Sequence, residues 1–310
     1  MNKDLIDLTE LTKEEIDELI ELAVKLKAKP DKYRKALKNK TLMMIFEKPS
    51  LRTRLSFETG MTQMGGHGIY YDLSTSPMGK KESVADTAKT ASRYVNIIMA
   101  RLNSHEQIKE LAKESSVPVI NALTNFSHPC QILSDLQTIY EKKGKLKGLK
   151  LAYLGDSNNN VTHSLMLGCA LVGMDISVGC PEGKEYEPNP EVKETAQEFA
   201  LKSGARVVIT NDAKEAVLDA DAVYTDSWMS YHIPKEKEAE RIKIFMPYQV
   251  NKELMSYAKQ DAIFMNCLPA IRGMEQTAEV IDGPQSIVFD QAENRLHMQK
   301  AIMLKLLKIV

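Results

Sequence analysis

The sequence predicts an α/β protein with two doubly wound domains, each a parallel sheet flanked by helices, joined by long helices. Short apolar runs typical of strands alternate with longer runs in which apolar residues return every three or four positions. This alternation starts twice along 310 residues, which is more than one hydrophobic core of ordinary size holds. Strands that alternate with helices favour parallel sheets covered by helices on both faces.

The first half of the chain contains four strand-like runs with helical patterns between them. An amphipathic run at 13–29 precedes the first strand and predicts a helix outside the alternation. The expected strands are TLMMIFE (41–47), HGIYYD (67–72), VNIIMAR (95–101) and VPVINAL (117–123), and the expected helices between them are 51–63, 82–94 and 105–115.

The second half repeats the pattern after a long predicted helix, HPCQILSDLQTIYEKKG (128–144). The basic stretch KKGKLKGLK (142–150) interrupts the apolar periodicity, so we place domains at 1–145 and 146–289, with a last helix at 290–310 that packs back on the first domain. The strand-like runs are LKLAYLGD (149–156), ALVG (170–173), MDISVGCP (174–181), ARVVITN (205–211), DAVYTDS (221–227) and AIFMNCLP (262–269).

The composition argues against several classes of protein. Lys and Arg number 41 against 42 Asp and Glu, so no global positive field exists to collect nucleic acid or an anionic membrane. The first residues carry charges without an apolar signal core, and no window is long and apolar enough to span a bilayer. Four cysteines without a CxxC pair suit reduced thiols, and six scattered histidines predict no metal site. We expect a cytoplasmic protein.

The segment EKPSLRTR, directly after the first predicted strand, has the composition of an anion site. Ser50 is a suitable helix cap, and the free backbone N–H groups beyond it, with Arg52, Thr53 and Arg54, form a phosphate cradle at a helix N-terminus. A capped helix with solvated arginines explains this short motif equally well.

Two further strand ends of the first half carry polar residues. Arg101 ends the third strand, and His128 and Gln131 lie in the first turn of the helix after the fourth, where Pro129 suits the first helical position. Taken singly, Arg101 could be a surface residue and His128 a structural histidine. Ligands of doubly wound folds bind at the carboxyl ends of the strands, so we expect these segments to line one anion-binding crevice.

The second half shows different chemistry at its strand ends. YLGDSNNN contains only Gly155 in place of a three-glycine turn, which disfavours a nicotinamide dehydrogenase. Asn159, Asn160, Asp226 and Cys267 follow strands and together describe a polar pocket. Each also has a structural explanation, as a cap or turn residue for Asp226 and as a small buried residue for Cys267.

Seven segments, in order and over nearly the whole chain, resemble the carbamoyltransferase family, most closely its ornithine-specific branch. They are SLRTRLSFE, MAR, HPCQ, NNV, DSW, NCLPA and QAENR. The resemblance implies a carbamoyl-phosphate domain, an amine-substrate domain, a homotrimer with active sites at subunit interfaces, and no metal or organic cofactor.

The resemblance also implies a role for individual residues. Arg101, His128 and Cys267 are the expected catalytic residues. The expected carbamoyl-phosphate contacts are Ser50, Leu51 through its backbone N–H, Arg52, Thr53, Arg101, His128, Gln131, Cys267, Leu268 and Arg295, and the expected amine-substrate contacts are Asn160, Asp226, Ser230 and Tyr231.

The sequence departs from the ornithine-specific pattern at several positions. Leu51 replaces a second threonine of the phosphate loop, and Asn266 replaces the histidine before Cys-Leu-Pro. Pro77 stands where the family usually has a residue that reaches the neighbouring subunit's site. Lys80 or Lys81 could replace that contact, and an equally good explanation is that both are solvated loop lysines. Tyr231 and His232 alter the loop that recognises the amino acid.

We therefore expect transfer of the carbamoyl group from carbamoyl phosphate to the side-chain amine of L-ornithine, giving citrulline and phosphate. The partners are these two small molecules and further copies of the chain, as a trimer or a multiple of trimers. The alternatives are a related acceptor such as putrescine, an acylated ornithine or aspartate, or a catalytically weak homologue that binds carbamoyl phosphate. The sequence leaves the metabolic direction open.

Overall fold

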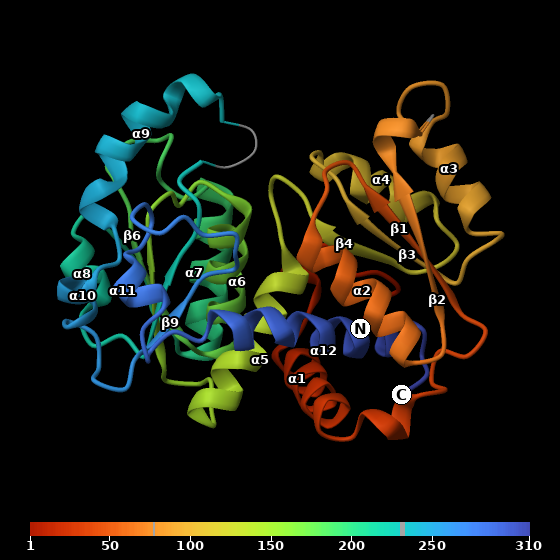
Figure 1. Ribbon diagram of the computed structural model, residues 1–310, viewed down its shortest axis with the longest axis horizontal. Coiled ribbons are helices and arrows are strands. Elements are labelled where there is room, and N and C mark those ends of the chain that lie inside the picture. Colours follow the sequence, from red (N-terminus) through yellow and green to blue (C-terminus); the bar gives the residue numbers. More distant parts are fainter. Residues whose placement is uncertain (77, 230–232) are drawn as a thin grey trace. The chain divides into compact units, whose positions relative to one another are not determined.

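The computed structural model describes residues 1–76, 78–229 and 233–310 of the chain. It divides into two compact units, and each contains one parallel sheet flanked by helices (Figure 1). The predicted α/β class is confirmed. Unit 1 comprises Met1–Gln137 and Glu293–Val310, and unit 2 comprises Thr138–Ala292.

Unit 1 contains a four-stranded sheet with the strand order β2-β1-β3-β4, in which every pair is parallel. The chain moves outward from β1 in both directions, so the order reverses between β1 and β3. The strands are β1 (Thr41–Phe46), β2 (His67–Asp72), β3 (Ile97–Arg101) and β4 (Val119–Leu123).

Helices cover both faces of this sheet. One face packs on α3 and α4, where Ile98 and Ala100 of β3 meet Val84, Ile108 and Leu111 in a fully apolar cluster. The helices of unit 1 are α1 (Lys13–Ala28), α2 (Leu51–Gln63), α3 (Val84–Ala91), α4 (His105–Glu114), α5 (Pro129–Lys143) as far as Gln137 and most of α12 (Val288–Leu306), with short 3₁₀ turns η1 (Leu8–Glu10), η2 (Pro30–Tyr33) and η3 (Leu73–Thr75).

Helix α12 joins unit 1 although it follows unit 2 in the sequence, and it contacts both α1 and α2. Lys27 of α1 donates to Asn294 Oδ1 at 2.9 Å, and Lys305 pairs with Glu18 at 2.7 Å. On the α2 side Gly60 lies beside the stem of Lys300, since a Cβ added there would be in ordinary van der Waals contact, 3.4 Å from Lys300 Cγ. The last segment of the chain is thus part of the packing of unit 1.

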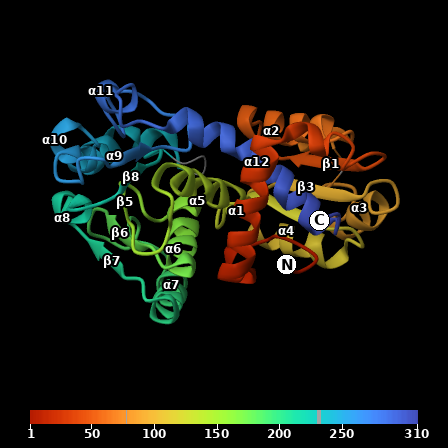
Figure 2. The same ribbon diagram turned by 90° about the horizontal axis from the view of Figure 1, so that it is seen from below.

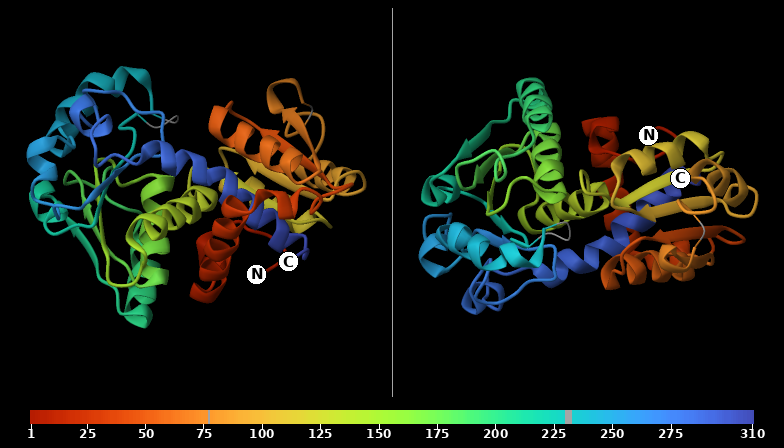
Figure 3. Two further views of the ribbon diagram at one scale, coloured as in Figure 1. Left: turned by 60° about the horizontal axis from the view of Figure 1, so that its bottom comes forward. Right: turned by 90° about the horizontal axis from the view of Figure 1, so that it is seen from above.

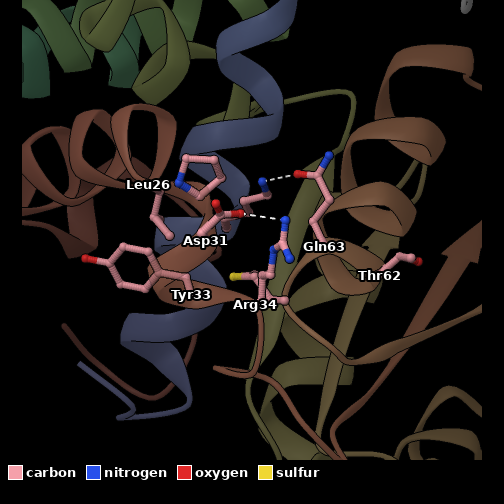
Figure 4. Close-up of a pocket in the computed structure, with 9 residues that line it drawn as sticks. Leu26, Asp31, Tyr33, Arg34, Thr62 and Gln63 are labelled. Carbon is pink, nitrogen blue, oxygen red and sulfur yellow. Dashed lines mark hydrogen bonds and ion pairs between the residues drawn. The ribbon is translucent and has the colours of Figure 1, made fainter.

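A cavity of about 470 Å³ lies in unit 1, lined by residues of α1, η2, α2 and α12 (Figure 4). Arg34 pairs with Asp31 at 2.7 Å at this cavity, and Lys300 donates to Gln63. None of the site residues predicted from the sequence lines it.

Unit 2 contains a five-stranded parallel sheet with the order β7-β6-β5-β8-β9, which reverses between β5 and β8. Helices α6 and α7 lie side by side along it (Figures 2 and 3). The strands are β5 (Lys150–Leu154), β6 (Asp175–Gly179), β7 (Val207–Thr210), β8 (Ala222–Thr225) and β9 (Ile263–Met265), and the helices are α6 (Asn160–Val172), α7 (Pro190–Ser203), α8 (Ala213–Val217), α9 (Glu238–Phe245), α10 (Lys252–Met255) and α11 (Ala278–Ile281), with η4 (Lys235–Lys237) and η5 (Met246–Tyr248).

One predicted strand is wrong. ALVG (170–173) lies at the end of α6, which is buried on nearly every side and therefore lacks the polar face that would mark it as a helix. Gly173, at φ +78°, ends that helix in the left-handed conformation. The expected helix at 82–94 is shorter in the structure, since Ser83 caps α3.

None of the described helices combines the length and the apolar character needed to cross a bilayer.

The start of α1 generates a first prediction. Thr12 Oγ1 accepts from Glu15 N at 3.2 Å while Glu15 Oε2 accepts from Thr12 N at 3.0 Å, so two terminal N–H groups are satisfied together. Thr12→Ala removes this box and should lower the free energy of unfolding by about 1 kcal/mol, measured by urea denaturation. Thr12→Ser keeps the hydroxyl and should unfold as the wild type; equal losses in both variants would show that the methyl group matters instead of the cap.

Candidate active site

The first group of predicted residues lies at the carboxyl edge of the unit 1 sheet, at the β1–β3 reversal. Phe46, the last residue of β1, pairs in register with Arg101, the last residue of β3. Ser50 caps α2, its Oγ accepting from Thr53 N at 3.4 Å, and the first turn of α2 thereby follows the end of β1. Doubly wound sheets bind ligands at this reversal, where helix N-termini favour anions.

Helix α12 contributes a guanidinium to the same group. Arg295 is buried, and its Nη1 donates to Gln131 Oε1 at 2.6 Å while Nη2 lies 3.4 Å from Thr53 Oγ1. Gln131 Nε2 in turn donates to Asp135 Oδ1 at 2.9 Å. The structure therefore links the first turn of α2, the first turn of α5 and α12 through one chain of side-chain contacts.

His128 lies among three arginines. Burial lowers its pKa well below the ordinary value, and the positive charges of Arg295, Arg101 and Arg52 lower that pKa further. The imidazole is consequently neutral near pH 7 and offers one N–H without adding a fourth positive charge. Three guanidiniums around a neutral histidine create a strongly positive, largely buried region that suits a doubly charged anion.

Arg54 does not belong to this group, which corrects the cradle expected from the sequence. Its Nε pairs with Glu58 at 3.1 Å, and its guanidinium lies 4.1 Å from the centre of the Tyr70 ring. The helical repeat places Arg54 on a different face of α2 from the buried Thr53. The Leu51 side chain is 69% exposed, and the contact of its backbone N–H with phosphate stays a prediction.

One contact of this edge was missed in the sequence. Glu47, directly after β1, accepts from the backbone N and the side-chain amide of Asn103, at 2.6 and 2.5 Å. Glu47 N also donates to Arg101 O at 2.9 Å. These bonds hold the two loops beside the arginines together, and a lone acidic residue after a strand gave no signal of that role.

The second group of predicted residues lies at the carboxyl edge of the unit 2 sheet, around its β5–β8 reversal. Cys267, two residues beyond β9, lies with its Sγ 3.2 Å from Asp226 Oδ1, directly after β8. Asn160 is the first residue of α6, after β5. Asn159 is the cap of α6, because its Oδ1 accepts from Val161 N at 2.9 Å and Thr162 N at 3.0 Å. Asn159 is thus structural.

Asn266, which departs from the family pattern, is completely buried and hydrogen-bonded on all sides. Its Oδ1 accepts from Leu268 N at 2.7 Å and its Nδ2 donates to Gln276 at 3.1 Å, while its backbone N donates to Gln291 Oε1 at 3.0 Å. Leu268 has a positive φ of 57°. The amide of Asn266 therefore supports the backbone of the Cys267–Leu268 turn.

The second group is acidic where the first is cationic. Asp156 and Glu275 are both buried, and the charge of Asp226 contributes to raising the pKa of each, after the larger effect of burial. Arg241 pairs with Asp156 at 2.5 Å and is the partner that opposes this rise in pKa. An excess of carboxylates at this edge suits an ammonium group. Sequence reasoning missed Asp156, Glu275 and Arg241. No strand-end pattern marks Glu275 or Arg241.

Several predicted residues lie outside this description. Pro77, Ser230, Tyr231 and His232 are outside the described residues. Lys80 and Lys81 are exposed in the loop after β2, and Lys80 Nζ lies 3.4 Å from Ser74 O.

Within residues 1–76, 78–229 and 233–310, no group of three or more His, Cys, Asp or Glu side chains is arranged to hold a metal ion.

Two family models match this chain. One, described as the carbamoyl-P binding domain of aspartate/ornithine carbamoyltransferase, matches residues 3–141. The other, described as the Asp/Orn binding domain of the same family, matches residues 147–306.

Proteins of known name and structure are similar over nearly their whole length. The chain is 53% identical to an ornithine carbamoyltransferase of Bacillus thuringiensis, over 99% of this chain and 95% of that one, and 52% identical to one of Thermococcus kodakarensis, over 97% and 95%. The ornithine carbamoyltransferase structure from Pyrococcus furiosus is similar with a TM-score of 0.93 at 49% identity, covering 97% of this chain and 96% of that one. The ornithine transcarbamoylase structure from Giardia lamblia gives 0.91 at 45% identity, covering 99% and 98%.

The thiols provide a test of the described geometry. Cys267 is partly exposed, whereas Cys130, Cys169 and Cys180 are buried, and burial raises the pKa of the Cys130 thiol to about 12. Iodoacetamide at neutral pH should modify Cys267 at least about tenfold faster than the other three, as read by peptide mass spectrometry. Cys267→Ser should leave the folded protein nearly unlabelled. Rapid labelling of Cys130 in the native protein would contradict the burial described for α5.

Proposed function

This chain belongs to the aspartate/ornithine carbamoyltransferase family, and we infer from that membership that it transfers the carbamoyl group of carbamoyl phosphate to the side-chain amine of L-ornithine. The products are citrulline and phosphate. Identity above 50% to ornithine carbamoyltransferases over nearly the full chain supports ornithine as the acceptor. The structural observation that best supports this reaction is the cluster of Arg52, Arg101 and Arg295 around a neutral His128.

We propose that unit 1 binds the donor. The phosphate dianion contacts Ser50, the Leu51 N–H, Arg52, Thr53 and Arg101, because this set combines a helix N-terminus with two guanidiniums. From the family resemblance, the proposed contacts of the carbamoyl group are His128, Gln131, Arg295, Cys267 and Leu268.

The chemistry requires charge stabilisation more than a protein nucleophile. The neutral amine attacks the carbamoyl carbon, a C–N bond forms, negative charge gathers on the carbonyl oxygen, and the bond to the phosphate oxygen breaks as the amine loses a proton. His128 and Arg101 donate to that oxygen, and Arg52 with the α2 N-terminus stabilises the departing phosphate. Losing one donor of this kind typically costs roughly 3 kcal/mol in the transition state.

We propose that unit 2 binds the amino acid. Asp226 accepts from the α-ammonium group, and Asn160, Ser230 and Tyr231 complete the contacts to the α-groups, which leaves the side-chain amine to react. The excess of carboxylates around Asp226 supports an ammonium ligand there. A free alkyl amine has a pKa near ~10, so the reaction requires its neutral form.

We also propose a cytoplasmic homotrimer, or a multiple of trimers, in which Lys80 or Lys81 reaches the active site of a neighbouring subunit. Both lysines are exposed. This role for them follows from the family resemblance of the loop that contains Pro77.

The arginines of α2 allow a matched test of the donor site. Arg52→Ala should lower kcat/KM for carbamoyl phosphate by roughly a hundredfold, because one phosphate contact is lost. Arg54→Ala removes a guanidinium two residues away that contacts Glu58 and Tyr70, and it should retain near-normal kinetics. Both are read from phosphate release at saturating ornithine. Equal losses in the two variants would remove Arg52 from its proposed role.

The acceptor is tested by comparing amines at saturating carbamoyl phosphate. We expect the highest specificity constant for L-ornithine among ornithine, lysine, putrescine, N-acetylornithine and aspartate, since only ornithine combines free α-groups with a δ-amine. Product formation is measured by citrulline colorimetry for ornithine and by mass spectrometry for the others. A higher specificity constant for another amine would make the Tyr231–His232 change a switch of acceptor, and no turnover with any amine would identify a binding homologue.

A further inference from the structure

Arg241 bridges two loops of unit 2 from a position that the mechanism does not use. It lies on α9, is only 6% exposed, and donates from Nη2 to Asp156 Oδ2 at 2.5 Å and from Nε to Trp228 O at 2.7 Å. Asp156 belongs to the loop after β5, and Trp228 belongs to the loop after β8. One rigid guanidinium therefore connects both sides of the β5–β8 reversal, where a doubly wound sheet binds its ligand.

Aromatic side chains hold this guanidinium in place. It lies 4.7 Å from the centre of the Phe245 ring and 5.7 Å from that of Tyr186. Phe245 also stacks on the fully buried Trp228, with ring centres 5.9 Å apart. Gly155 gives the Trp228 ring its space, because a Cβ at Gly155 would lie 3.1 Å from Trp228 Nε1. The contacts restrict Arg241 to one arrangement.

Each of the two bridged loops carries a residue assigned to the acceptor. Asp226 lies two residues before Trp228, and Asn160 lies four residues after Asp156. The Asp156 carboxylate also accepts from Asn158 N at 3.1 Å, which orders the start of the segment that leads to Asn160. Arg241 thus connects the two loops that carry Asp226 and Asn160.

We propose that Arg241 is a positioning residue for the acceptor amino acid, acting through Asp156 and the Trp228 carbonyl to hold Asn160 and Asp226 at the spacing that the α-groups of ornithine require. This inference rests on the proposed function, since it assumes that Asn160 and Asp226 bind the acceptor. A lysine at this position keeps the charge but lacks the fork that reaches two acceptors at once. Geometry, and not charge alone, is therefore what Arg241 supplies.

The ion pair between Arg241 and Asp156 should also make acceptor binding depend on pH. Burial raises the pKa of Asp156 to about 6, against the opposing effect of Arg241 and with a further rise from Asp226. The groups that face this carboxylate are Arg241 from α9, Asp226 after β8, the Tyr153 hydroxyl of β5, the Asn158 amide of its own loop and the Cys180 thiol after β6. As the pH falls through about 6, Asp156 takes up a proton and its bond to Arg241 loses its ionic character.

The test separates acceptor binding from donor binding and from stability. The variants are Arg241→Met, Arg241→Lys, Asp156→Asn and the double variant Arg241→Met/Asp156→Asn, which leaves no buried carboxylate without its cation. Arg206→Met is the control, because Arg206 pairs with Asp175 at 2.6 Å on the surface of the same unit. The readouts are KM for ornithine, KM for carbamoyl phosphate, thermal unfolding and the Kd of L-norvaline at saturating carbamoyl phosphate. Norvaline has the α-groups of ornithine without its reactive amine.

We expect KM for ornithine and Kd for norvaline to rise roughly 10- to 100-fold in the Met and double variants, as losing a supporting residue typically causes. KM for carbamoyl phosphate should stay within about twofold. Arg241→Lys should recover part of the loss, and Arg206→Met should match the wild type. In the wild type, Kd for norvaline should rise as the pH falls through about 6, and Asp156→Asn should show the weaker value at every pH.

A folded double variant with wild-type KM and Kd would overturn the proposal, as would an equal rise in both Michaelis constants. If Arg241→Met fails to fold, Arg241→Lys and the double variant decide by the same criteria. Failure of the proposed function looks different, because the wild type itself would then not turn over ornithine or bind norvaline.

Discussion

Unit 1 must hold three positively charged arginines close together at the carboxyl edge of its sheet, and this requirement constrains the rest of the unit. Arg52, Arg101 and Arg295 come from a helix start, a strand end and a distant helix, and all three act on the same buried histidine. Such charges are costly to hold together in a protein interior unless hydrogen bonds fix them and an anion neutralises them. The chain of contacts from Thr53 through Arg295 and Gln131 to Asp135 supplies the first condition, and the phosphate of the proposed donor, carbamoyl phosphate, supplies the second. Here the depressed pKa of His128 is useful, since a protonated histidine would add to the repulsion.

Unit 2 uses the same sheet architecture with the opposite sign of charge. Its carboxylates, Asp156, Asp226 and Glu275, outnumber the one guanidinium paired among them, and burial raises the pKa of Asp156 and of Glu275. Parallel strands bring loop residues to one edge whatever their chemistry, so the identity of the few residues after each strand decides which ligand binds. The charges of the two edges suit the anionic donor and the amine acceptor proposed for them.

Sequence reasoning located much of this because strand ends are visible in the apolar pattern. Ser50, Arg52 and Arg101 follow clear strands, and the structure places all three at the β1–β3 edge. Arg295 came only from the family resemblance, since nothing local to α12 indicates that its side chain contacts Gln131, which lies 164 positions earlier. Arg241 was missed for the same reason, as its partners lie 85 and 13 residues away. Arg54 was assigned wrongly because adjacency in sequence does not give the face of a helix, and ALVG was misread because α6 is buried all round.

The return of α12 to unit 1 also has a consequence for the order in which a ribosome makes the protein. Residues 1–137 emerge first, and the whole of unit 2 is synthesised before Glu293–Val310 appears. During that interval the nascent unit 1 lacks the helix that packs against α1 and α2, and it lacks Arg295. Two of the three arginines are then present without the third, so we expect the nascent domain to attract phosphate groups more weakly than the complete unit 1 does. The proposed donor site is completed only after residues 138–292 have been made, so the capacity to bind the reactive phosphate follows the synthesis of the proposed acceptor unit.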